Sequence, residues 1–390
     1  MDLARVMPFA EVLGIEPGRA TPEEVRARVA WDPSRCTSGG VLHGGVLMGL
    51  ADSVGGACAF LNLPEGSAGT ATIESKTNFL RAVRDGHGSP PARTLHFARE
   101  AGATGGAGMR LVTIRTANGT RAGRVEGDRV IELDAPDVGA LLADPGWERA
   151  AASDGGASHA LADADLATLV PRPSKIICLG LNYASHIKEM GHELPKHPTL
   201  FAKFPGTLIG ARDPIVLPRV SEQVDWEVEL GVVVGRRARH VTVDEAMDAI
   251  AGYTVVNDVS VRDYQRRTSE FLSGKIFEAT TPVGPALVTL DELPDRGGDL
   301  VVRCEVDGEV RQESRTSDLL FGPAEIISYV SEIITLEPGD LIATGTPGGV
   351  GAARTPPVWL RPGQVVRTVV EGVGECVNRC VPEAEVAVRS

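Results

Sequence analysis

The stretch that decides the fold is Asp225-Trp-Glu-Val-Glu-Leu-Gly-Val-Val-Val-Gly235. Read as a β-strand, it places Glu227 and Glu229 on one face and four apolar side chains on the other, because successive side chains of a strand alternate. Two carboxylates that converge inside so apolar a segment repel each other unless a cation lies between them. The pattern therefore favours a metal site on a buried strand over a polar strand face in contact with water.

A third carboxylate, Asp258, lies at the end of the next strong apolar strand, within NDVSVRDYQ (257–265). Three carboxylates with no His or Cys nearby make an all-oxygen site, which suits Mg²⁺, Mn²⁺ or Ca²⁺ better than zinc. Three protein ligands also leave positions open for water and substrate, as a catalytic metal requires. We therefore predict a divalent metal held by Glu227, Glu229 and Asp258.

Upstream, the segment LNYASHIKEM (181–190) follows the apolar strand KIICLG (175–180). If the segment is helical, His186 and Glu189 face the same side. A carboxylate that accepts from one imidazole nitrogen raises the basicity of the other, which makes a dyad able to deprotonate water. The alternative is a His–Glu pair on the surface, which is the more common meaning of such a pair in isolation.

Two further motifs are weaker on their own. Lys275 stands in a Gly-Lys pair, and a lone lysine is usually solvated. The glycine-rich run ATGTPGGVG (343–351) is neither a dinucleotide-binding fingerprint nor a P-loop. Free N–H groups in such a turn can still hold a carboxylate or an oxyanion.

Composition excludes several classes of protein. The net charge of −13 repels phosphate backbones and anionic lipid, so we expect no nucleic-acid or membrane partner. No signal-peptide pattern and no window of ~18 uninterrupted apolar residues is visible, and the six scattered cysteines do not form a disulfide framework. We expect a cytoplasmic protein in which Cys376 and Cys380 are buried strand residues rather than a zinc pair.

Composition also divides the chain. The 45 Gly and 26 Pro indicate short strands joined by many turns, and so a β-rich mixed α/β fold rather than a doubly wound sheet. Residues 1–86 form one segment, and 87–108 have no period and are predicted to be a linker. Three short strands with tight turns open a small β-rich subdomain over 109–165, and strong apolar strands fill a larger domain over 174–385.

Two helices are expected in the domain over 174–385. Thr242 and Glu245 make a capping box for a helix near 243–250. Pro323 can start another helix, for which we predict one apolar face. The residues of that face are Ile326, Ile327, Val330, Ile333 and Ile334.

Five motifs in this order resemble the fumarylacetoacetate hydrolase family: GLNYASHIKE, DWEVELGVVVG, NDVSVRDYQ, GKIFEATTPVGP and PGDLIATGTPGGVG. The resemblance covers about 109–385. It implies a β-roll catalytic domain with a small N-terminal β subdomain, and a homodimer. Glu278 and Ile276 depart from residues common in the family, which leaves the substrate open.

The resemblance also implies roles for individual residues. The metal pair of the family falls on Glu227 and Glu229, and its third ligand falls on Asp258. The remaining matches are Lys275 as a catalytic lysine, Arg262, Gln265 and Thr346 as substrate-binding residues, and His186 with Glu189 as a dyad on a lid helix.

These roles imply a metal-dependent enzyme that hydrolyses a C–C bond in a 2,4-diketo acid of the acylpyruvate or fumarylpyruvate type, in the catabolism of aromatic compounds. Mg²⁺, Mn²⁺ or Ca²⁺ would act as Lewis acid, and His186 would activate water. Decarboxylation of a 2-oxo acid, or isomerisation of the 2-hydroxymuconate type, at the same site is the alternative.

The N-terminal segment resembles a different family. HGGVLMGLADSVGGA followed by TATIESKTNFLRAV is similar to the start of a hotdog-fold acyl-CoA thioesterase, with Asp52 at the position of its catalytic carboxylate. The resemblance stops at about residue 86, before three further strands of that fold. We therefore expect a partial α+β hotdog segment without thioesterase activity. The alternative is an acyl-CoA-binding or thioesterase protein whose second half is structural.

Overall fold

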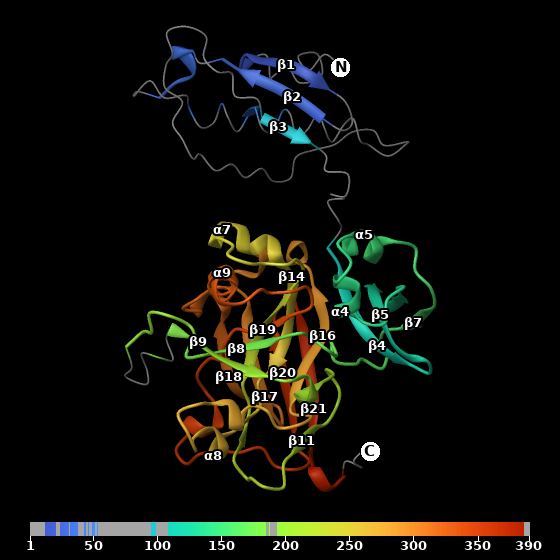
Figure 1. The fold of residues 1–390 in the computed structure, drawn as a ribbon, viewed down its shortest axis with the longest axis vertical. Helices are drawn as coiled ribbons and strands as arrows, with labels where there is room; N and C mark the ends of the chain where they lie inside the picture. Colours follow the sequence, from blue (N-terminus) through green and yellow to red (C-terminus); the bar gives the residue numbers. More distant parts are fainter. Residues whose placement is uncertain are drawn as a thin grey trace. The chain divides into compact units, whose positions relative to one another are not determined.

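The structure is a computed structural model, and it describes residues 12–20, 24–30, 32–37, 43, 46, 49, 50, 53, 95–98, 108–184, 187 and 193–385. The chain divides into two compact units, Met1–Gly105 and Gly106–Ser390, called unit 1 and unit 2 below. Figure 1 shows the described elements of each unit.

Unit 1 contains a small antiparallel sheet. Its described strands are β1 (Ile15–Ala20), β2 (Glu24–Val29) and β3 (Leu95–Ala98), in that order. Strand β3 lies inside the linker predicted over 87–108, so that prediction was wrong for these four residues. A four-residue strand is too short to show a period, and its partner β2 stands far earlier in the chain. Asp52 lies outside the described residues.

Unit 2 is built around a mixed sheet of eleven described strands. The antiparallel pair at its centre is β13 (Val228–Val234) and β14 (Ile250–Asn257), and every residue of both strands is buried. Parallel pairing joins β19 (Leu341–Ala343) to β8 (Ile176–Gly180). The other strands of this sheet are β4 (Arg110–Thr116), β5 (Gly119–Glu126), β6 (Arg129–Glu132), β7 (Ser158–Ala160), β9 (Thr199–Lys203), β10 (Leu208–Ile209) and β16 (Thr281–Val288).

A second sheet packs against the central strands of the first. Its order is β11-β21-β20-β17-β18, and β17, β20 and β21 contact β13, β14 and β16. The shared core includes Val228 and Leu230 from the first sheet and Cys376 and Cys380 from the second. The two cysteines are buried strand residues, as predicted. The bounds are β11 (Ile215–Leu217), β17 (Val301–Val306), β18 (Glu309–Arg315), β20 (Val365–Val370) and β21 (Gly374–Pro382).

The subdomain predicted over 109–165 opens with β4, β5 and β6. It adds the short helices α4 (Val138–Leu142) and α5 (Trp147–Ala152), and α4 contacts β4 and β5 (Figure 1). Their buried faces form a second apolar cluster together with the opposite face of the central sheet. The β-rich mixed α/β architecture is therefore confirmed for unit 2.

The two helices predicted for this part of the chain pack on each other. Helix α7 (Val243–Ala246) begins with the predicted capping box, and α9 (Pro323–Ile333) begins at the predicted proline. The apolar face predicted for the second helix was wrong at its end, because Ile333 and Ile334 are exposed. Ile334 is already extended, so the helical period no longer determines which way it points.

The register of the central strands places the acidic residues together. Strands β13 and β14 are antiparallel, and Val228 pairs with Asn257. The next residues beyond this pair, Glu227 and Asp258, therefore lie opposite each other at the end of the two strands. Directly beyond, the two-residue strands β12 (Val224–Asp225) and β15 (Ser260–Val261) pair antiparallel. Among the described residues, no helix is long and apolar enough to span a membrane.

We propose that residues 109–390 fold and function without the preceding segment, because a domain buries its own apolar surface. A protein comprising only these residues should stay soluble and unfold cooperatively, which thermal denaturation followed by circular dichroism measures. It should match the full chain in kcat/KM, and the full chain should not hydrolyse acyl-CoA esters. Aggregation of the shorter protein would show that unit 1 stabilises unit 2.

Candidate active site

Three carboxylates converge at the end of the central strands. One oxygen each of Glu227, Glu229 and Asp258 lies within 4.8 Å of the others, and all three side chains are buried. Within the part of the chain that the structure describes, this is the only cluster of His, Cys, Asp or Glu that could hold a metal ion. The structure therefore brings together the three residues that the sequence grouped.

Main-chain hydrogen bonds fix the positions of two of these residues. The Asp258 N–H donates to the Glu227 carbonyl at 2.8 Å, and the Glu227 N–H donates to Asn257 Oδ1 at 3.0 Å. These bonds join two segments that are 30 residues apart in the chain. The spacing of the carboxylates is thus set by backbone contacts and not by the flexible side chains alone.

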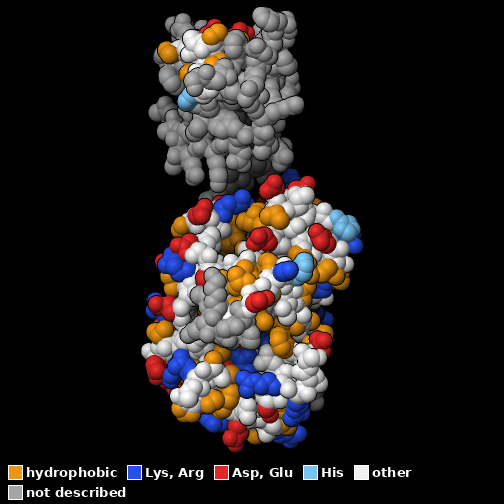
Figure 2. Space-filling view, turned by 90° about the vertical axis from the view of Figure 1, so that its left-hand side faces the viewer, with side chains coloured by type: hydrophobic (Ala, Val, Ile, Leu, Met, Phe, Trp, Pro, Cys, Tyr) orange, Lys and Arg blue, Asp and Glu red, His pale blue; other side chains and the backbone are white. Residues whose placement is uncertain are grey.

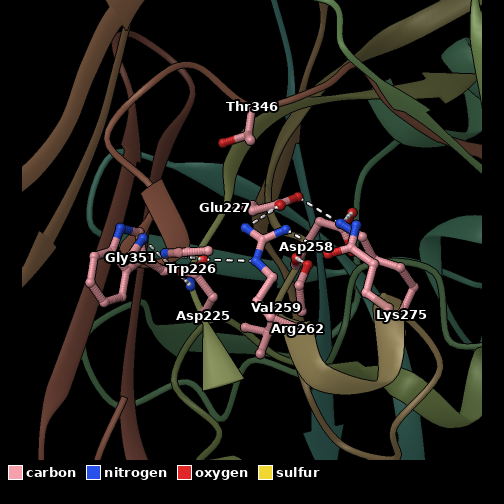
Figure 3. Close-up of polar contacts among 12 residues, drawn as sticks. Asp225, Trp226, Glu227, Asp258, Val259, Arg262, Lys275, Thr346 and Gly351 are labelled. Carbon is pink, nitrogen blue, oxygen red and sulfur yellow. Dashed lines mark hydrogen bonds and ion pairs between the residues drawn. The ribbon is translucent and has the colours of Figure 1, made fainter. Parts of the chain in front are cut away.

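Two lysines pair with this cluster. Lys275 Nζ lies 2.7 Å from Glu227 Oε2 and 2.6 Å from Asp258 Oδ2 (Figure 3). Lys203 Nζ lies 2.6 Å from Asp258 Oδ1. Both lysines are 2% exposed, so their charges are compensated by these carboxylates and not by water.

Arg262 pairs with two acidic side chains, Glu227 and Asp225. Its Nη2 lies 2.6 Å from Glu227 Oε1, and its Nε lies 2.8 Å from Asp225 Oδ2. Asp225 also accepts hydrogen bonds from the N–H groups of Gly351 and Ala352 at 2.7 and 3.0 Å. The buried charges therefore alternate in sign along one continuous chain, which we call the charge chain: Asp225, Arg262, Glu227, Lys275, Asp258 and Lys203.

Glu229 is the carboxylate of the cluster that does not belong to the charge chain. Its Oε2 accepts from the Gly345 N–H at 2.7 Å, while its Oε1 is buried without a hydrogen-bond donor among the described residues. A buried carboxylate oxygen without a partner is unfavourable and usually indicates an ion or a water molecule. This orphaned oxygen, beside two other carboxylates, fits a hard divalent cation.

Burial and charge act differently on these groups. Burial raises the pKa of Glu229 well above its usual range, and the negative charges of Asp258 and Glu227 raise it further. Burial also raises the pKa of Asp258, but Lys203 and Lys275 outweigh this effect and lower it. Burial lowers the pKa of Lys275, whereas Asp258 and Glu227 raise it above its usual value overall, so Lys275 is an ammonium at neutral pH.

A cavity of about 360 Å³ opens beside the charge chain. Glu227, Lys275 and Arg262 reach it from one side, and the apolar side chains of Phe201 and Phe271 line another part. Lys275 Nζ also lies 4.9 Å from the centre of the Phe201 ring. The cavity therefore combines an ionic wall with an aromatic one, as small-molecule sites commonly do.

Thr346 and Gln265 line the same cavity. Gln265 ends the short helix α8 (Arg262–Gln265) and accepts from Arg262 Nη1 at 2.9 Å. Gly274 lets the Lys275 loop approach this helix, since a Cβ there would lie 2.5 Å from the Cβ of Gln265. The structure thus places Lys275, Arg262, Gln265 and Thr346 around one space.

A buried glutamine holds the Thr346 loop in place. Gln312 Nε2 donates to Thr346 Oγ1 and to the Pro347 carbonyl, both at 2.8 Å, and its Oε1 accepts from the Val228 N–H at 3.1 Å. Thr346 Oγ1 in turn donates to the Val228 carbonyl at 2.9 Å. We call this the Gln312 clip, because it joins the Thr346 loop to the strand that carries Glu229.

The dyad predicted at His186 and Glu189 lies outside the described residues and stays a prediction. Next to it, the Ile187 N–H donates to the Tyr183 carbonyl at 3.0 Å, four residues earlier, as in a helical turn.

Sequence reasoning missed Lys203, Asp225 and Gln312. Lys203 ends the apolar strand TLFAK, and this position could have indicated a buried lysine with an acidic partner, since buried lysines are rare unless paired. Asp225 is the first residue of DWEVELGVVVG, whereas no local sequence pattern distinguishes Gln312.

We predict that Glu229→Gln abolishes binding of Mg²⁺ or Mn²⁺ while the protein still folds. The amide oxygen can still accept from the Gly345 N–H, so the substitution removes only the negative charge that a hard cation needs. Titration calorimetry with Mn²⁺ measures the binding, and the exposed Glu313→Gln serves as control. Unchanged affinity in Glu229→Gln would exclude this residue as a ligand.

We predict that Gln312→Leu lowers the free energy of unfolding by about 2–4 kcal/mol, because it leaves the Val228 N–H and the Pro347 carbonyl buried without partners. Urea denaturation measures this change. Gln364→Leu, at a half-buried glutamine that donates to Asp307 in an exposed hydrogen bond, should cost less than about 1 kcal/mol. If both variants lower the free energy of unfolding by the same amount, the Gln312 clip stabilises the fold no more than the Gln364 hydrogen bond does.

Comparison with known families agrees with this geometry. The model named fumarylacetoacetate (FAA) hydrolase C-terminal matches residues 175–381, more than half of the chain. The Rv2993c-like, N-terminal model matches 109–168, and the thioesterase superfamily model matches 39–87. The last match confirms the thioesterase-like segment recognised in the sequence.

Several relatives are similar to unit 2. Mitochondrial oxaloacetate tautomerase FAHD2A from Bos taurus is 46% identical over 214 residues, which cover 54% of this chain and 68% of the relative. Fumarylacetoacetate hydrolase from Exiguobacterium antarcticum is a solved structure with 32% identity and a TM-score of 0.63, covering 70% of this chain and 99% of that one.

A third relative is 5-carboxymethyl-2-hydroxymuconate delta-isomerase from Mycobacterium smegmatis. This solved structure has 35% identity and a TM-score of 0.60, and it covers 70% of this chain and 100% of that one. Family model, relatives and fold agree: the chain belongs to the fumarylacetoacetate hydrolase family of enzymes.

Proposed function

We propose that unit 2 interconverts the keto and enol forms of a 2-oxo acid in a metal-dependent reaction, with oxaloacetate as the first substrate to test. The observation that carries this proposal is the position of Lys275, an ammonium group that lines the cavity and belongs to the charge chain. The similarity to oxaloacetate tautomerases supports the choice of substrate.

Enolisation of a 2-oxo acid removes a proton from C3 and places negative charge on the C2 oxygen. A divalent cation held by Glu227, Glu229 and Asp258 would supply Lewis-acid stabilisation of that charge. Lys275 adds to it, because an ammonium has three protons and only two are directed at Glu227 Oε2 and Asp258 Oδ2. The third proton is available to the cavity.

We assign Lys275 the role of hydrogen-bond donor and not that of base. Asp258 and Glu227 raise its pKa in spite of burial, which favours the ammonium form. Abstraction of the C3 proton therefore needs another group. The predicted His186, supported by Glu189, is the candidate for that role.

Thr346 offers an acceptor to the substrate. Its hydroxyl proton is directed at the Val228 carbonyl, and Gln312 donates to the same oxygen. The remaining lone pair can accept a hydrogen bond from a ligand that carries an O–H group, which the enol form has and the keto form lacks. Gln265 offers the opposite polarity, since its oxygen is occupied by Arg262 and its amide N–H groups can bind a carboxylate.

Hydrolysis of a C–C bond in a 2,4-diketo acid is the second candidate. The likeness to a solved fumarylacetoacetate hydrolase favours it, as does the spacing of His186 and Glu189. The same enolate stabilisation would serve this reaction, but a water molecule must then be activated for attack on the distal carbonyl.

We expect Mg²⁺-loaded protein to accelerate the decay of enol oxaloacetate, followed by its ultraviolet absorbance, and chelator treatment to abolish the effect. Lys275→Met should lower kcat by roughly 10²–10³, as loss of one donor to an oxyanion does, while the exposed Lys196→Met changes nothing. Circular dichroism verifies that both variants fold.

The same preparations, incubated with acylpyruvates, separate the two candidates. Rapid acylpyruvate cleavage that His186→Ala lowers by roughly 10²–10⁴, with no acceleration of the oxaloacetate reaction, would replace tautomerisation by hydrolysis. Release of CO₂ from oxaloacetate at the rate of enol decay would indicate decarboxylation instead.

A further inference from the structure

The wall of the cavity carries one more cation, Arg266, which the chemistry above does not use. Of the described lining residues, one is acidic and three are basic: Glu227, Arg262, Arg266 and Lys275. Because buried carboxylates compensate Arg262 and Lys275, Arg266 is the lining cation whose charge is left for an anionic ligand among the residues described.

The three cations differ in how their charge is compensated. Arg262 pairs with Asp225 and Glu227, and Lys275 pairs with Glu227 and Asp258. Arg266 is exposed and forms no ion pair with any residue that the structure describes. No described carboxylate competes for its guanidinium group, which can bind an anion with two parallel hydrogen bonds.

Gln265 places a second donor beside it. Arg262 Nη1 donates to Gln265 Oε1 at 2.9 Å, so the amide nitrogen of Gln265 is the end left for the cavity. Among the described residues nothing accepts a hydrogen bond from that nitrogen. Gln265 and Arg266 are consecutive and both line the cavity, so an amide N–H and a guanidinium group stand on the same part of its wall.

The neighbouring Arg267 provides a contrast. Its guanidinium carbon lies 3.4 Å from the centre of the Tyr264 ring, and it does not line the cavity. Figure 2 shows the face of the molecule on the side of β9 and α8, where Lys and Arg side chains gather over the lower part. Among the described residues, Arg266 lines the cavity and has no acidic partner, which distinguishes it from Arg262.

We propose that Arg266, with the amide of Gln265, binds the second carboxylate of the substrate, which makes unit 2 selective for 2-oxo dicarboxylic acids over 2-oxo monocarboxylic acids. This inference rests on the proposed function in one respect, namely that the 2-oxo acid end of the ligand lies at the carboxylate cluster. The distal carboxylate then replaces solvent at Arg266.

The test compares two ligands of equal chain length, 2-oxoglutarate and 2-oxopentanoate, which differ in a terminal carboxylate against a methyl group. Titration calorimetry of the Mg²⁺-loaded full chain measures the affinity of both for the wild type, Arg266→Gln, Arg266→Lys and the matched control Arg267→Gln. Each Gln variant removes one positive charge from the same segment, so a general electrostatic effect would be equal in the two.

The wild type should bind the dicarboxylate at least tenfold more tightly, near the lower end of what a charge-assisted hydrogen bond contributes. Arg266→Gln should bring the ratio close to one by weakening the dicarboxylate alone, and Arg266→Lys should restore part of it. Arg267→Gln should keep the wild-type ratio. With oxaloacetate as substrate, Arg266→Gln should raise KM about tenfold and leave kcat within twofold.

Equal weakening of both ligands by Arg266→Gln, or the same result in Arg267→Gln, overturns the proposal, as does a wild type that binds neither ligand. Loss of the preference in Arg266→Gln with no tautomerase activity in the wild type would retain this binding site and reject the proposed reaction. Tautomerase activity with an unchanged KM in Arg266→Gln would do the reverse.

Discussion

The site depends on one constraint: seven charged side chains are buried together and must compensate each other without water. Desolvation of an ion in a protein costs several kcal/mol, and a close opposite charge offsets this only when the geometry is good. The charge chain meets this condition because each member has an opposite charge within 2.8 Å. The charge chain connects β9, the β12–β15 pair and the Lys275 loop, so the positions of these segments depend on one another.

Glu229 breaks the alternation. It forms no ion pair with a described cation, and burial together with the charges of Asp258 and Glu227 raises the pKa of its carboxyl. A site in which six charges compensate each other and the seventh does not is incomplete as a protein structure alone. A divalent cation at this place would complete it, and metal binding would then also stabilise the folded site.

The sequence reveals the parts of this arrangement that follow from local pattern. Alternation within DWEVELGVVVG places Glu227 and Glu229, and the strand end at Asn257 places Asp258, because the side-chain period of a strand is short-range information. Arg262, Gln265, Lys275 and Thr346 were assigned by resemblance, and the structure brings them to the same cavity. Lys203 and Gln312 were not found, because they reach the site from strands 55 and 84 residues away from the groups they contact. Strand β3 was missed for a related reason, since its partner β2 is distant and four residues show no period.

The charge chain and the segment after Gln265 differ in what they allow for protein engineering. Each side chain of the charge chain is paired with a buried partner, and a substitution leaves a charge uncompensated. Directly after Gln265, residues 266–270 are exposed, and no described member of this stretch forms an ion pair with the carboxylate cluster. The segment can therefore be exchanged or lengthened at little cost in folding, since surface loops tolerate such changes well. A library confined to these five positions would vary the choice of substrate while the reactive centre stays the same.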